Sequence, residues 1–473
     1  MTIDLSRRLF VAGAAALSAA PAFARSRASK SAAPPQNPLV RQRADAQVFR
    51  HEDGQYYLTG SVPEYDRLVL RRSPTLAGLT TAKEVVLWRH VSSGPLSGFI
   101  WAPELHLIDG KWIMYFAAGP SGGGEDVFRI RTYAIVCNGP DPMTGTWSLL
   151  GQFQAPWDSF NLDSTSFVHR GTRYFAWAQR EPSIETNSNL YIAPLATPLT
   201  LAAKATRLTA PTLDWEIRGY KVAEAPAILA RNGRLFMTYS ASATDARYCL
   251  GMLTIADDAN LMDASAWTKS PEPVFTTSAV TNVYGPGHNS FTTDEAGRDI
   301  LIYHGRDYEA ISGDPLFDPN RHTRMQRLYY KADGTPDFGI PVGNGVLPER
   351  FSPAERPGDF LYHAGDVVRV GQGALPATQF RSFPGKAGRG SVCLGPIDAP
   401  GRFIVAADDG TIRLASDDGS PDFARRSSFV RRAEQNGHAS FAAIGTPARQ
   451  LSHVDGVLRL RPSGGASARF IVS

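Results

Sequence analysis

The stretch that decides the fold is WAPELHLIDGKWIMYFAA, residues 101–118. It consists of a short apolar segment, a turn at Gly110 and an aromatic-rich segment. Apolar residues that alternate on both sides of such a turn predict a β-hairpin. The same pattern recurs in four further segments: DAQVFRHEDGQYYLTGS (45–61), DSTSFVHRGTRYFAWAQ (163–179), EAPAILARNGRLFMTYSAS (224–242) and HNSFTTDEAGRDILIYHGR (288–306).

The spacing of these hairpins is nearly constant. Their turn glycines are 56, 61, 62 and 64 residues apart and are Gly54, Gly110, Gly171, Gly233 and Gly297. A unit of about 60 residues has room for four strands, which make one propeller blade. Unrelated hairpins in a β-sandwich would not need this regularity. The sequence therefore predicts an all-β protein whose residues 41–345 form a five-bladed β-propeller.

The repeat also predicts where a site lies. Nine residues before their turn glycines stand Asp45, Trp101, Glu224 and His288, and eight residues before its glycine stands Asp163. Equivalent positions of successive blades surround the propeller axis. We therefore expect these five side chains to meet at one end of that axis.

Three carboxylates around one concave centre favour acid–base chemistry. Like charges and burial raise at least one pKa, so that one group holds a proton while another stays ionised. Glycoside cleavage needs such an acid and such a base. Glu224 has the longer reach and precedes an apolar run, which favours it as the general acid. Asp45 and Asp163 then share the roles of base and of orienter and pKa modulator.

Other residues are candidates for binding substrate. Trp101 and Phe99 offer ring faces to a sugar. His288 is a candidate both for substrate binding and for a structural calcium site in the propeller channel, although Ca²⁺ prefers oxygen ligands. Arg321 and Arg324, in GDPLFDPNRHTRMQRL (313–328), can hydrogen-bond hydroxyls or carboxylates. The chemistry itself needs no cofactor.

The N-terminus has the pattern of an export signal. SRRLFV at residues 6–11 is a twin-arginine motif, and a short apolar stretch and AFA at 22–24 follow. We expect residues 1–24 to be a cleaved signal peptide, residues 25–40 a flexible linker, and the protein to be periplasmic or secreted. No other stretch is apolar enough for a membrane helix.

Composition excludes further classes. The formal net charge is +4, and no basic stretch is interleaved with aromatics, so nucleic acid is not an expected partner. The 3 cysteines, Cys137, Cys249 and Cys393, are far apart and predict buried thiols rather than a disulfide framework. We expect a monomer.

Residues 346–473 contain a second repeat. PGDFLYH begins at Pro357, PGRFIVA at Pro400 and PARQLSH at Pro447, which are 43 and 47 residues apart. Short strands such as DVVRV and TIRL follow. Three such units predict a β-trefoil over residues 346–473.

Seven stretches together resemble glycoside hydrolase family 43, and within it the exo-1,5-α-L-arabinofuranosidases: DAQVFRHEDGQYYLTGSVPEYDRL, FIWAPELH, NLDSTSF, YKVAEAPAIL, GPGHNSF, YHGRDYE and GDPLFDPNRHTR. The resemblance implies an inverting enzyme with Asp45 as base, Asp163 as pKa modulator and Glu224 as acid. Two motifs depart from the family pattern. Ala46 follows Asp45 where proline is usual, and Ala223 and Ala225 flank Glu224 where asparagine and glycine are common.

The C-terminal repeat resembles the arabinofuranose-binding trefoil that is often fused to such enzymes. Its pockets combine a histidine with an aspartate three residues before a later phenylalanine. His363 and His453 keep the histidine and are candidates for secondary sugar sites, whereas the second repeat has Ala406. The three expected aspartate positions hold Ala377, Arg426 and Ser467. A trefoil with a purely structural role therefore stands beside a sugar-binding one.

The leading expectation is release of terminal α-L-arabinofuranose from plant cell-wall arabinan or arabino-oligosaccharides. A β-xylosidase is the alternative within the same fold, because the same propeller and carboxylates serve xylosides. A non-catalytic carbohydrate-binding protein is the alternative of another class. The sequence leaves exo against endo cleavage open, because loop lengths alone do not decide it.

Overall fold

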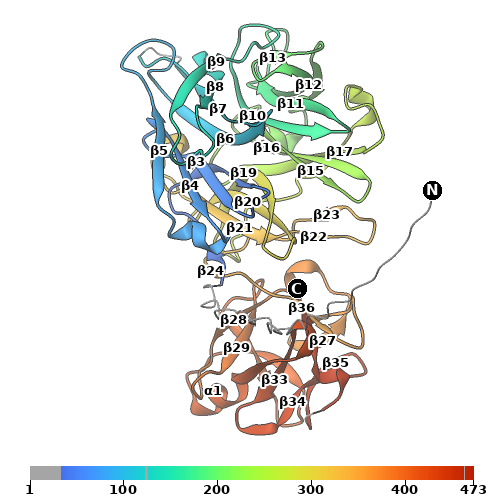
Figure 1. Cartoon of the computed structure of the whole chain (residues 1–473). Helices are drawn as coiled ribbons and strands as arrows, with labels where there is room; N and C mark the ends of the chain where they lie inside the picture. The colour runs from blue at the N-terminus through green and yellow to red at the C-terminus, as the bar shows by residue number, and fades with distance from the viewer. Residues whose placement is uncertain (1–33, 123–125, 463) are drawn as a thin grey trace, which may run out of the picture. The chain divides into compact units, whose positions relative to one another are not determined.

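The computed structural model describes residues 34–122, 126–462 and 464–473 (Figure 1). The expected signal peptide and most of the expected linker lie outside the described residues. Pro34–Ser473 belong to one compact unit, so the boundary expected at residue 345 stays a prediction.

Antiparallel sheets follow one another along the chain, and each begins with the strand that leads into a repeat turn (Figure 1). The first two contain β2 (Ala44–Arg50), β3 (Tyr56–Ser61), β4 (Arg67–Ser73), β5 (Glu84–Arg89), β6 (Ile100–Ile108), β7 (Lys111–Ala118), β8 (Arg131–Cys137) and β9 (Trp147–Gln152). The third contains β10 (Asn161–His169), β11 (Thr172–Gln179), β12 (Asn189–Thr197), β13 (Thr200–Leu201) and β14 (Thr206–Thr209). The last two contain β15 (Ala223–Arg231), β16 (Arg234–Ala241), β17 (Cys249–Ala256), β18 (Thr268–Lys269), β19 (Tyr284–Thr293), β20 (Asp299–Arg306) and β21 (His322–Arg327).

The first strands of the five sheets form a closed ring. β2 contacts β6, β6 contacts β10, β10 contacts β15, β15 contacts β19, and β19 contacts β2 again. Figure 1 shows β6, β10, β15 and β19 beside one another in the middle of this part of the chain. Strands of separate sheets that meet in a ring define a propeller, so the predicted five-bladed β-propeller is confirmed.

The N-terminal segment pairs with the last blade of the propeller. Part of the expected flexible linker is therefore folded. Val40 forms a bridge with Thr323 of β21, and the Leu39 N–H donates to the Thr323 carbonyl at 2.8 Å. β1 (Gln36–Asn37) pairs with β24 (Gly345–Val346). Residues 36–40 are thus part of the fold rather than flexible, because the apolar Leu39 and Val40 side chains are buried.

Aromatic strand residues form cores between neighbouring blades, as the hairpin patterns predict. Tyr115 of β7, Phe175 and Trp177 of β11 and Tyr191 of β12 pack in one buried cluster. The expected buried thiols are confirmed, since Cys137, Cys249 and Cys393 are free and buried.

The C-terminal strands form a trefoil, as predicted. The twelve strands of its sheet are β25 (Phe351–Pro353), β26 (Phe360–Ala364), β27 (Val367–Gly371), β28 (Phe380–Pro384), β29 (Val392–Pro396), β30 (Arg402–Ala406), β31 (Ile412–Ser416), β32 (Phe429–Ala433), β33 (His438–Ala443), β34 (Thr446–Val454), β35 (Val457–Pro462) and β36 (Phe470–Val472). The repeated PGDFLYH-like motifs occupy β26, β30 and β34, and the later phenylalanines begin β28, β32 and β36. The repeat unit is therefore four strands long.

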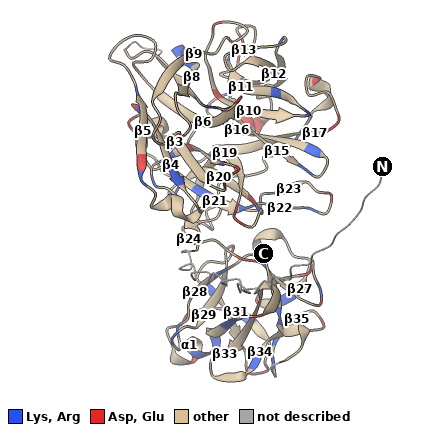
Figure 2. Cartoon of the chain, viewed as in Figure 1, with Lys and Arg blue, Asp and Glu red and all other residues tan. Residues whose placement is uncertain are grey.

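Helices are short. The described α-helix is α1 (Pro421–Ser427), and its N-cap Ser420 accepts from the Phe423 N–H. The remaining described elements are β22 (Tyr329–Tyr330), β23 (Pro336–Asp337) and the 3₁₀ turns η1 (Ala77–Thr80), η2 (Asp126–Arg129), η3 (Asp214–Glu216), η4 (Ala264–Ala266), η5 (Pro315–Phe317), η6 (Leu375–Thr378), η7 (Gln435–Gly437) and η8 (Ala466–Ala468). No helix in the described part of the chain is long and apolar enough to cross a membrane. Figure 2 shows basic and acidic residues interspersed along the strands.

Candidate active site

Every inner strand of the propeller is interrupted at the same place by a β-bulge. In each blade the ladder register shifts across two residues, and the first of these has a left-handed backbone with φ between 42° and 53°. These five residues are Asp45, Ala102, Asp163, Ala225 and His288. A bulge turns side chains out of the regular alternation of a strand, which is how the inner strands aim groups at the axis.

The bulges show that the five side chains which the sequence predicts at equivalent positions are not all equivalent. Asp45, Asp163 and His288 occupy the bulge itself, whereas Trp101 and Glu224 stand one residue earlier. The count from the turn glycine fails because hairpin loops differ in length. The first blade leaves residues 51–55 between its strands, while the fourth leaves only residues 232–233.

The structure nevertheless brings these side chains together. A cavity of about 250 Å³ is lined by Asp45, Asp163, Glu224, Trp101 and His288. The same cavity is lined by Ser242 at the end of the fourth motif and by residues outside the repeat motifs: Phe128, Phe160, Leu162, Asn187, Tyr220, Val222, Thr244, Tyr248, Asp314, Leu316 and Arg321. Acids from the first, third and fourth blades thus share one concave, partly apolar space.

Asp45 is held ionised by its neighbours. Its Oδ2 accepts from the Ser61 hydroxyl at 2.6 Å, and its Oδ1 accepts from Arg321 at 3.2 Å. The Nδ1 atoms of His288 and His304 lie 3.4 and 3.3 Å from Oδ1. Burial alone would raise the pKa of Asp45, but the charge of Arg321 and the contacts with the two histidines lower it well below its usual range. A buried carboxylate of this kind can accept a proton.

Asp163 and Glu224 are in the opposite electrostatic situation. Burial, followed by the charges of Glu224 and Asp45, raises the pKa of Asp163 well above its usual range, although the Ala225 N–H bonds its carboxylate. Burial also raises the pKa of Glu224 to about 7. The hydroxyl of Tyr248, which donates to Glu224 Oε1 at 2.7 Å, acts in the opposite direction and lowers this pKa. The two interacting carboxyls therefore hold a proton between them near neutral pH.

His288 connects the two kinds of carboxylate. Its Nδ1 lies 3.4 Å from Asp45 Oδ1 and 3.7 Å from Asp163 Oδ2. Burial lowers the pKa of His288 despite these acids. In residues 34–122, 126–462 and 464–473, no group of three or more His, Cys, Asp and Glu side chains is placed to hold a metal ion.

The expected aromatic wall is present in part. Trp101 lines the cavity, whereas Phe99 packs behind it with ring centroids 4.9 Å apart. Tyr65 meets Trp101 edge-on at 5.8 Å and receives a hydrogen bond from Arg321 at 2.8 Å. Phe99 therefore supports the ring face of Trp101 and is not itself among the lining residues.

The two arginines predicted to bind substrate, Arg321 and Arg324, lie in different surroundings. Arg321 lines the cavity and bonds Asp45. Arg324 does not reach the cavity, which corrects the expectation. Its guanidinium is fully buried and bonds Asp307 and the side-chain oxygen of Asn344. The two residues are three apart on and just before strand β21, so their side chains leave the strand on opposite faces.

Several lining residues, above all Tyr248 and Tyr220, are not among the site residues predicted from the sequence. Tyr248 immediately precedes β17, the third strand of its blade, and its ring is stacked on His304 at 5.6 Å. Tyr220 lies on a loop and Leu316 in the 3₁₀ turn η5, where the repeat gives no position to count. Ser61 and His304 could have been found, because both stand seven residues after a turn glycine.

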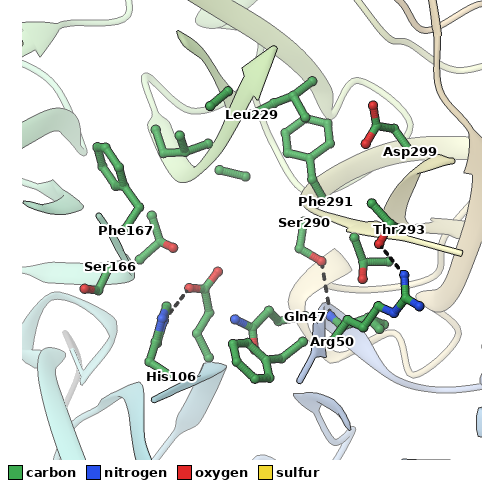
Figure 3. A pocket seen from close by; sticks show the side chains of 18 of the residues that line it. Gln47, Arg50, His106, Ser166, Phe167, Leu229, Ser290, Phe291, Thr293 and Asp299 are labelled. Atoms are coloured by element: carbon green, nitrogen blue, oxygen red, sulfur yellow. Dashed lines mark hydrogen bonds and ion pairs between the residues drawn. The ribbon is translucent and has the colours of Figure 1, made fainter. Parts of the chain in front are cut away.

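A second cavity, of about 380 Å³, lies further along the same inner strands and is shown in Figure 3. Gln47, His106, Ser166 and Ser290 face it from different blades. Its acids are paired: Glu104 bonds His106 at 2.9 Å, and Asp299 bonds Arg231. This larger cavity therefore lacks the unpaired acid–base set of the smaller one.

The trefoil histidines lie against carboxylates of their own chain. His363 Nε2 is 2.8 Å from Asp398 Oδ1, and this hydrogen bond raises the pKa of His363. His453 Nε2 is 2.9 Å from Glu355 Oε1. Arg426, at one expected aspartate position, is paired with Asp408 and Asp422.

The sequence is similar to known glycosidases over nearly all of its described length. Residues 35–336 match the family described as glycosyl hydrolases family 43, and residues 349–471 match the alpha-L-arabinofuranosidase B domain. An extracellular exo-alpha-(1->5)-L-arabinofuranosidase of Streptomyces avermitilis is 48% identical over 436 residues, which are 91% of this chain and 90% of the relative. One of Streptomyces chartreusis is 54% identical over 66% of this chain and 94% of the relative.

A solved structure agrees with the fold of the propeller. The crystal structure of an alpha-L-arabinofuranosidase from Lactobacillus brevis has a TM-score of 0.64 and 49% sequence identity, and the match covers 66% of this chain and 98% of that one. Together with the carboxylate cavity, these similarities identify the chain as a glycosidase that belongs to glycosyl hydrolase family 43, with a C-terminal domain of the alpha-L-arabinofuranosidase B type.

Proposed function

We propose that this protein is an inverting exo-1,5-α-L-arabinofuranosidase that removes terminal arabinofuranose from arabinan or arabino-oligosaccharides. The observation that carries the proposal is the cavity in which Asp45 is held ionised while Asp163 and Glu224 share a proton. The names of the relatives from Streptomyces support the choice of sugar and linkage.

In this proposal, Glu224 is the general acid and Asp45 the general base. Glu224 protonates the glycosidic oxygen as the bond to the anomeric carbon breaks. Asp45 takes a proton from the water that attacks that carbon from the other face, so the configuration inverts. Asp163 shares a proton with Glu224, and the mutual repulsion of the two carboxylates keeps this proton on the pair near neutral pH. Arg321 keeps Asp45 ionised.

The size of the cavity supports exo cleavage. A volume of about 250 Å³ is below the range of drug-sized ligand pockets, which begin near about 300 Å³. Such a space suits one terminal sugar rather than a stretch of chain. Trp101 offers this sugar a ring face, and Leu316 and Phe160 bring apolar walls.

A neighbouring cavity gives the rest of the substrate a place. About 610 Å³ in volume, it shares Tyr220 with the catalytic cavity. The ring of Tyr220 is 55% exposed, and Asp245, Arg247 and Glu309 add polar groups. We propose that the leaving arabinofuranose residues bind there.

Product analysis on linear 1,5-arabinan tests the function. We expect arabinose as the sole early product, and proton NMR should detect the inverted β-anomer first. Longer oligomers at early times would show endo cleavage. Aryl α-L-arabinofuranoside and aryl β-D-xyloside, compared at equal concentration, distinguish the β-xylosidase alternative. Arabinan binding with no turnover on either substrate would identify a non-catalytic binding protein.

A structural calcium in the channel stays a prediction. Two of the channel oxygen donors are already engaged, since Glu104 bonds His106 and the Gln47 side-chain oxygen accepts from the Leu105 N–H. This donor set does not fit a protein cage for Ca²⁺, and no step of the chemistry depends on one. Metal analysis of the purified protein, before and after EDTA, tests the prediction.

We also propose that the protein is exported by the twin-arginine signal of residues 1–24. The two Streptomyces relatives are named extracellular, which supports export. Expression of the full chain with Arg7 and Arg8 changed to lysine should leave it in the cytoplasm, whereas the unchanged chain should appear outside with its signal removed. Equal export of both proteins would contradict the twin-arginine route.

A further inference from the structure

One position of the propeller repeat links a blade to the next wherever its side chain is polar. It is the residue of the second strand that pairs with the residue just before the bulge. Its five occupants are Ser61, Ala117, Ala178, Ser240 and His304. In the three blades where this residue is polar, it accepts a hydrogen bond from the bulge N–H of the following blade.

Ser61 connects this backbone bond to the proposed base, Asp45. Its hydroxyl oxygen accepts from the Ala102 N–H of the second blade at 2.8 Å. A hydroxyl has only one proton to donate, and that of Ser61 goes to Asp45 Oδ2 at 2.6 Å. Because the incoming N–H fixes the oxygen, the direction of the outgoing bond is fixed as well. Ser61 is nearly fully buried, so water does not compete for the bond.

Ser240 stands at the equivalent place on the side of the proposed acid. Its hydroxyl oxygen accepts from the His288 N–H of the fifth blade at 2.7 Å. The hydroxyl of Tyr248, whose pKa the Ser240 side chain lowers, donates to Glu224 Oε1 at 2.7 Å. Ser240 also pairs with Glu224 directly across the β15–β16 ladder. Ser240 is therefore placed to act on the acid.

We propose that Ser61 and Ser240 are a matched pair of positioning residues, one orienting the base Asp45 and the other orienting the acid Glu224 through Tyr248. This inference rests on the proposed function. It assigns the two serines no contact with substrate. Ser61 converts a backbone N–H of the neighbouring blade into a directed hydroxyl donor at a carboxyl group, and Ser240 acts on its carboxyl group through the hydroxyl of Tyr248.

The other blades show that the fold itself does not require a hydroxyl here. Alanine occupies the same position in the second and third blades, as Ala117 and Ala178. The bulge N–H of the fourth blade, from Ala225, is taken instead by the carboxylate of Asp163. Ser61→Ala and Ser240→Ala thus introduce a residue that the repeat already accommodates.

The test is the pH profile of kcat/KM on an aryl α-L-arabinofuranoside. A carboxylate that loses a hydroxyl donor binds its proton more tightly. Ser61→Ala should therefore move the acidic limb to higher pH and lower activity roughly tenfold on that limb, as a shift of about one pKa unit implies. Ser240→Ala should leave the acidic limb in place and move the basic limb to higher pH, because Tyr248 no longer donates in a fixed direction.

The controls separate positioning from stability. Ser61→Thr and Ser240→Thr keep the hydroxyl and should restore the wild-type limbs. Ser290→Ala removes another hydroxyl that joins two blades, since Ser290 accepts from the Val48 N–H and donates to the Ala46 carbonyl without touching a carboxylate. It should lower Tm to a similar degree and leave both limbs unchanged.

Unmoved limbs in both alanine variants would overturn the inference. So would limbs that move equally in Ser290→Ala, or threonine variants that behave like the alanine ones. A wild-type protein that does not cleave the arabinofuranoside at all would instead refute the proposed function.

Discussion

The propeller and the trefoil are both built from repeats, but their polar residues are arranged differently. In the propeller, Asp45, Asp163 and Glu224 meet in a cavity that holds more acid than base. In the trefoil, His363 and His453 each lie against a single carboxylate of their own chain. The position in a repeat determines where a side chain lies, and the groups around that side chain determine whether it is free to react.

The histidines show the same contrast. Burial lowers the pKa of His304 to about 3 and also lowers that of His288, although both lie beside Asp45. The bond to Asp398 raises the pKa of His363, which is only partly buried. The propeller histidines are thus neutral near pH 7, whereas His363 is stabilised as a cation by its ion pair.

The largest expected loss of activity comes from removing a carboxyl group of the acid–base pair in the propeller cavity. Glu224→Gln and Asp45→Asn should each lower kcat on arabinobiose by about 10²–10⁴-fold, because each removes one half of the acid–base pair. Steady-state kinetics with released arabinose as the readout check this. The matched control is Asp366→Asn, an exposed ion-pair residue of the trefoil that should keep full activity. More than a tenth of the wild-type rate in either propeller variant would refute the assigned role.

A smaller loss of activity is expected when the carboxyl pair that shares a proton is broken. Asp163→Asn abolishes the repulsion between the two carboxylates that keeps the shared proton on the pair, so the pKa of Glu224 should fall and the basic limb should move to lower pH. We expect activity at pH 7 to fall by about 10–100-fold and to recover in part at pH 5. The pH dependence of kcat/KM on an aryl arabinofuranoside measures both. A basic limb that stays in place would show that Asp163 does not act on Glu224.

Arg321 should affect the other limb. Its guanidinium lowers the pKa of Asp45, and that carboxylate is needed in its ionised form, so activity is lost as pH falls through this pKa. Arg321→Gln should raise the pKa and move the acidic limb upward, with a loss of about tenfold near pH 4. Arg324→Gln is the comparison, because Arg324 is buried away from the cavity and should lower Tm without moving either limb.

The smallest effect is expected in the trefoil. The raised pKa of His363 means that its ion pair contributes stability fully below the unfolded pKa, and that this stability is lost as pH rises through the folded pKa. His363→Ala should therefore lower the unfolding free energy by less than about 1 kcal/mol at pH 5 and have almost no effect at pH 8. Thermal unfolding at the two pH values checks this. An equal loss at both would mean that packing, not charge, stabilises the pair.

Much of this architecture follows from the sequence because the repeat is regular. The turn glycines give the number of blades, and the spaced proline motifs give the three trefoil units. The repeat also locates Asp45, Asp163, Glu224, Trp101 and His288 in one cavity.

The remaining details depend on geometry that no motif encodes. Loop length shifted the count for Asp163 by one residue relative to Asp45, although both occupy the bulge. Strand alternation sends Arg321 to the cavity and Arg324 away from it. Tyr220 comes from a loop and Leu316 from the 3₁₀ turn η5, and the partner of His363 is Asp398 rather than a residue at the expected position.

The most direct test is a crystal structure of the Glu224→Gln variant with arabinobiose. The amide of residue 224 should lie within hydrogen-bond distance of the glycosidic oxygen, with Asp45 on the opposite face of the terminal ring and room for one water between them. A terminal sugar bound elsewhere, or Asp45 and residue 224 on the same face of its ring, would contradict the account.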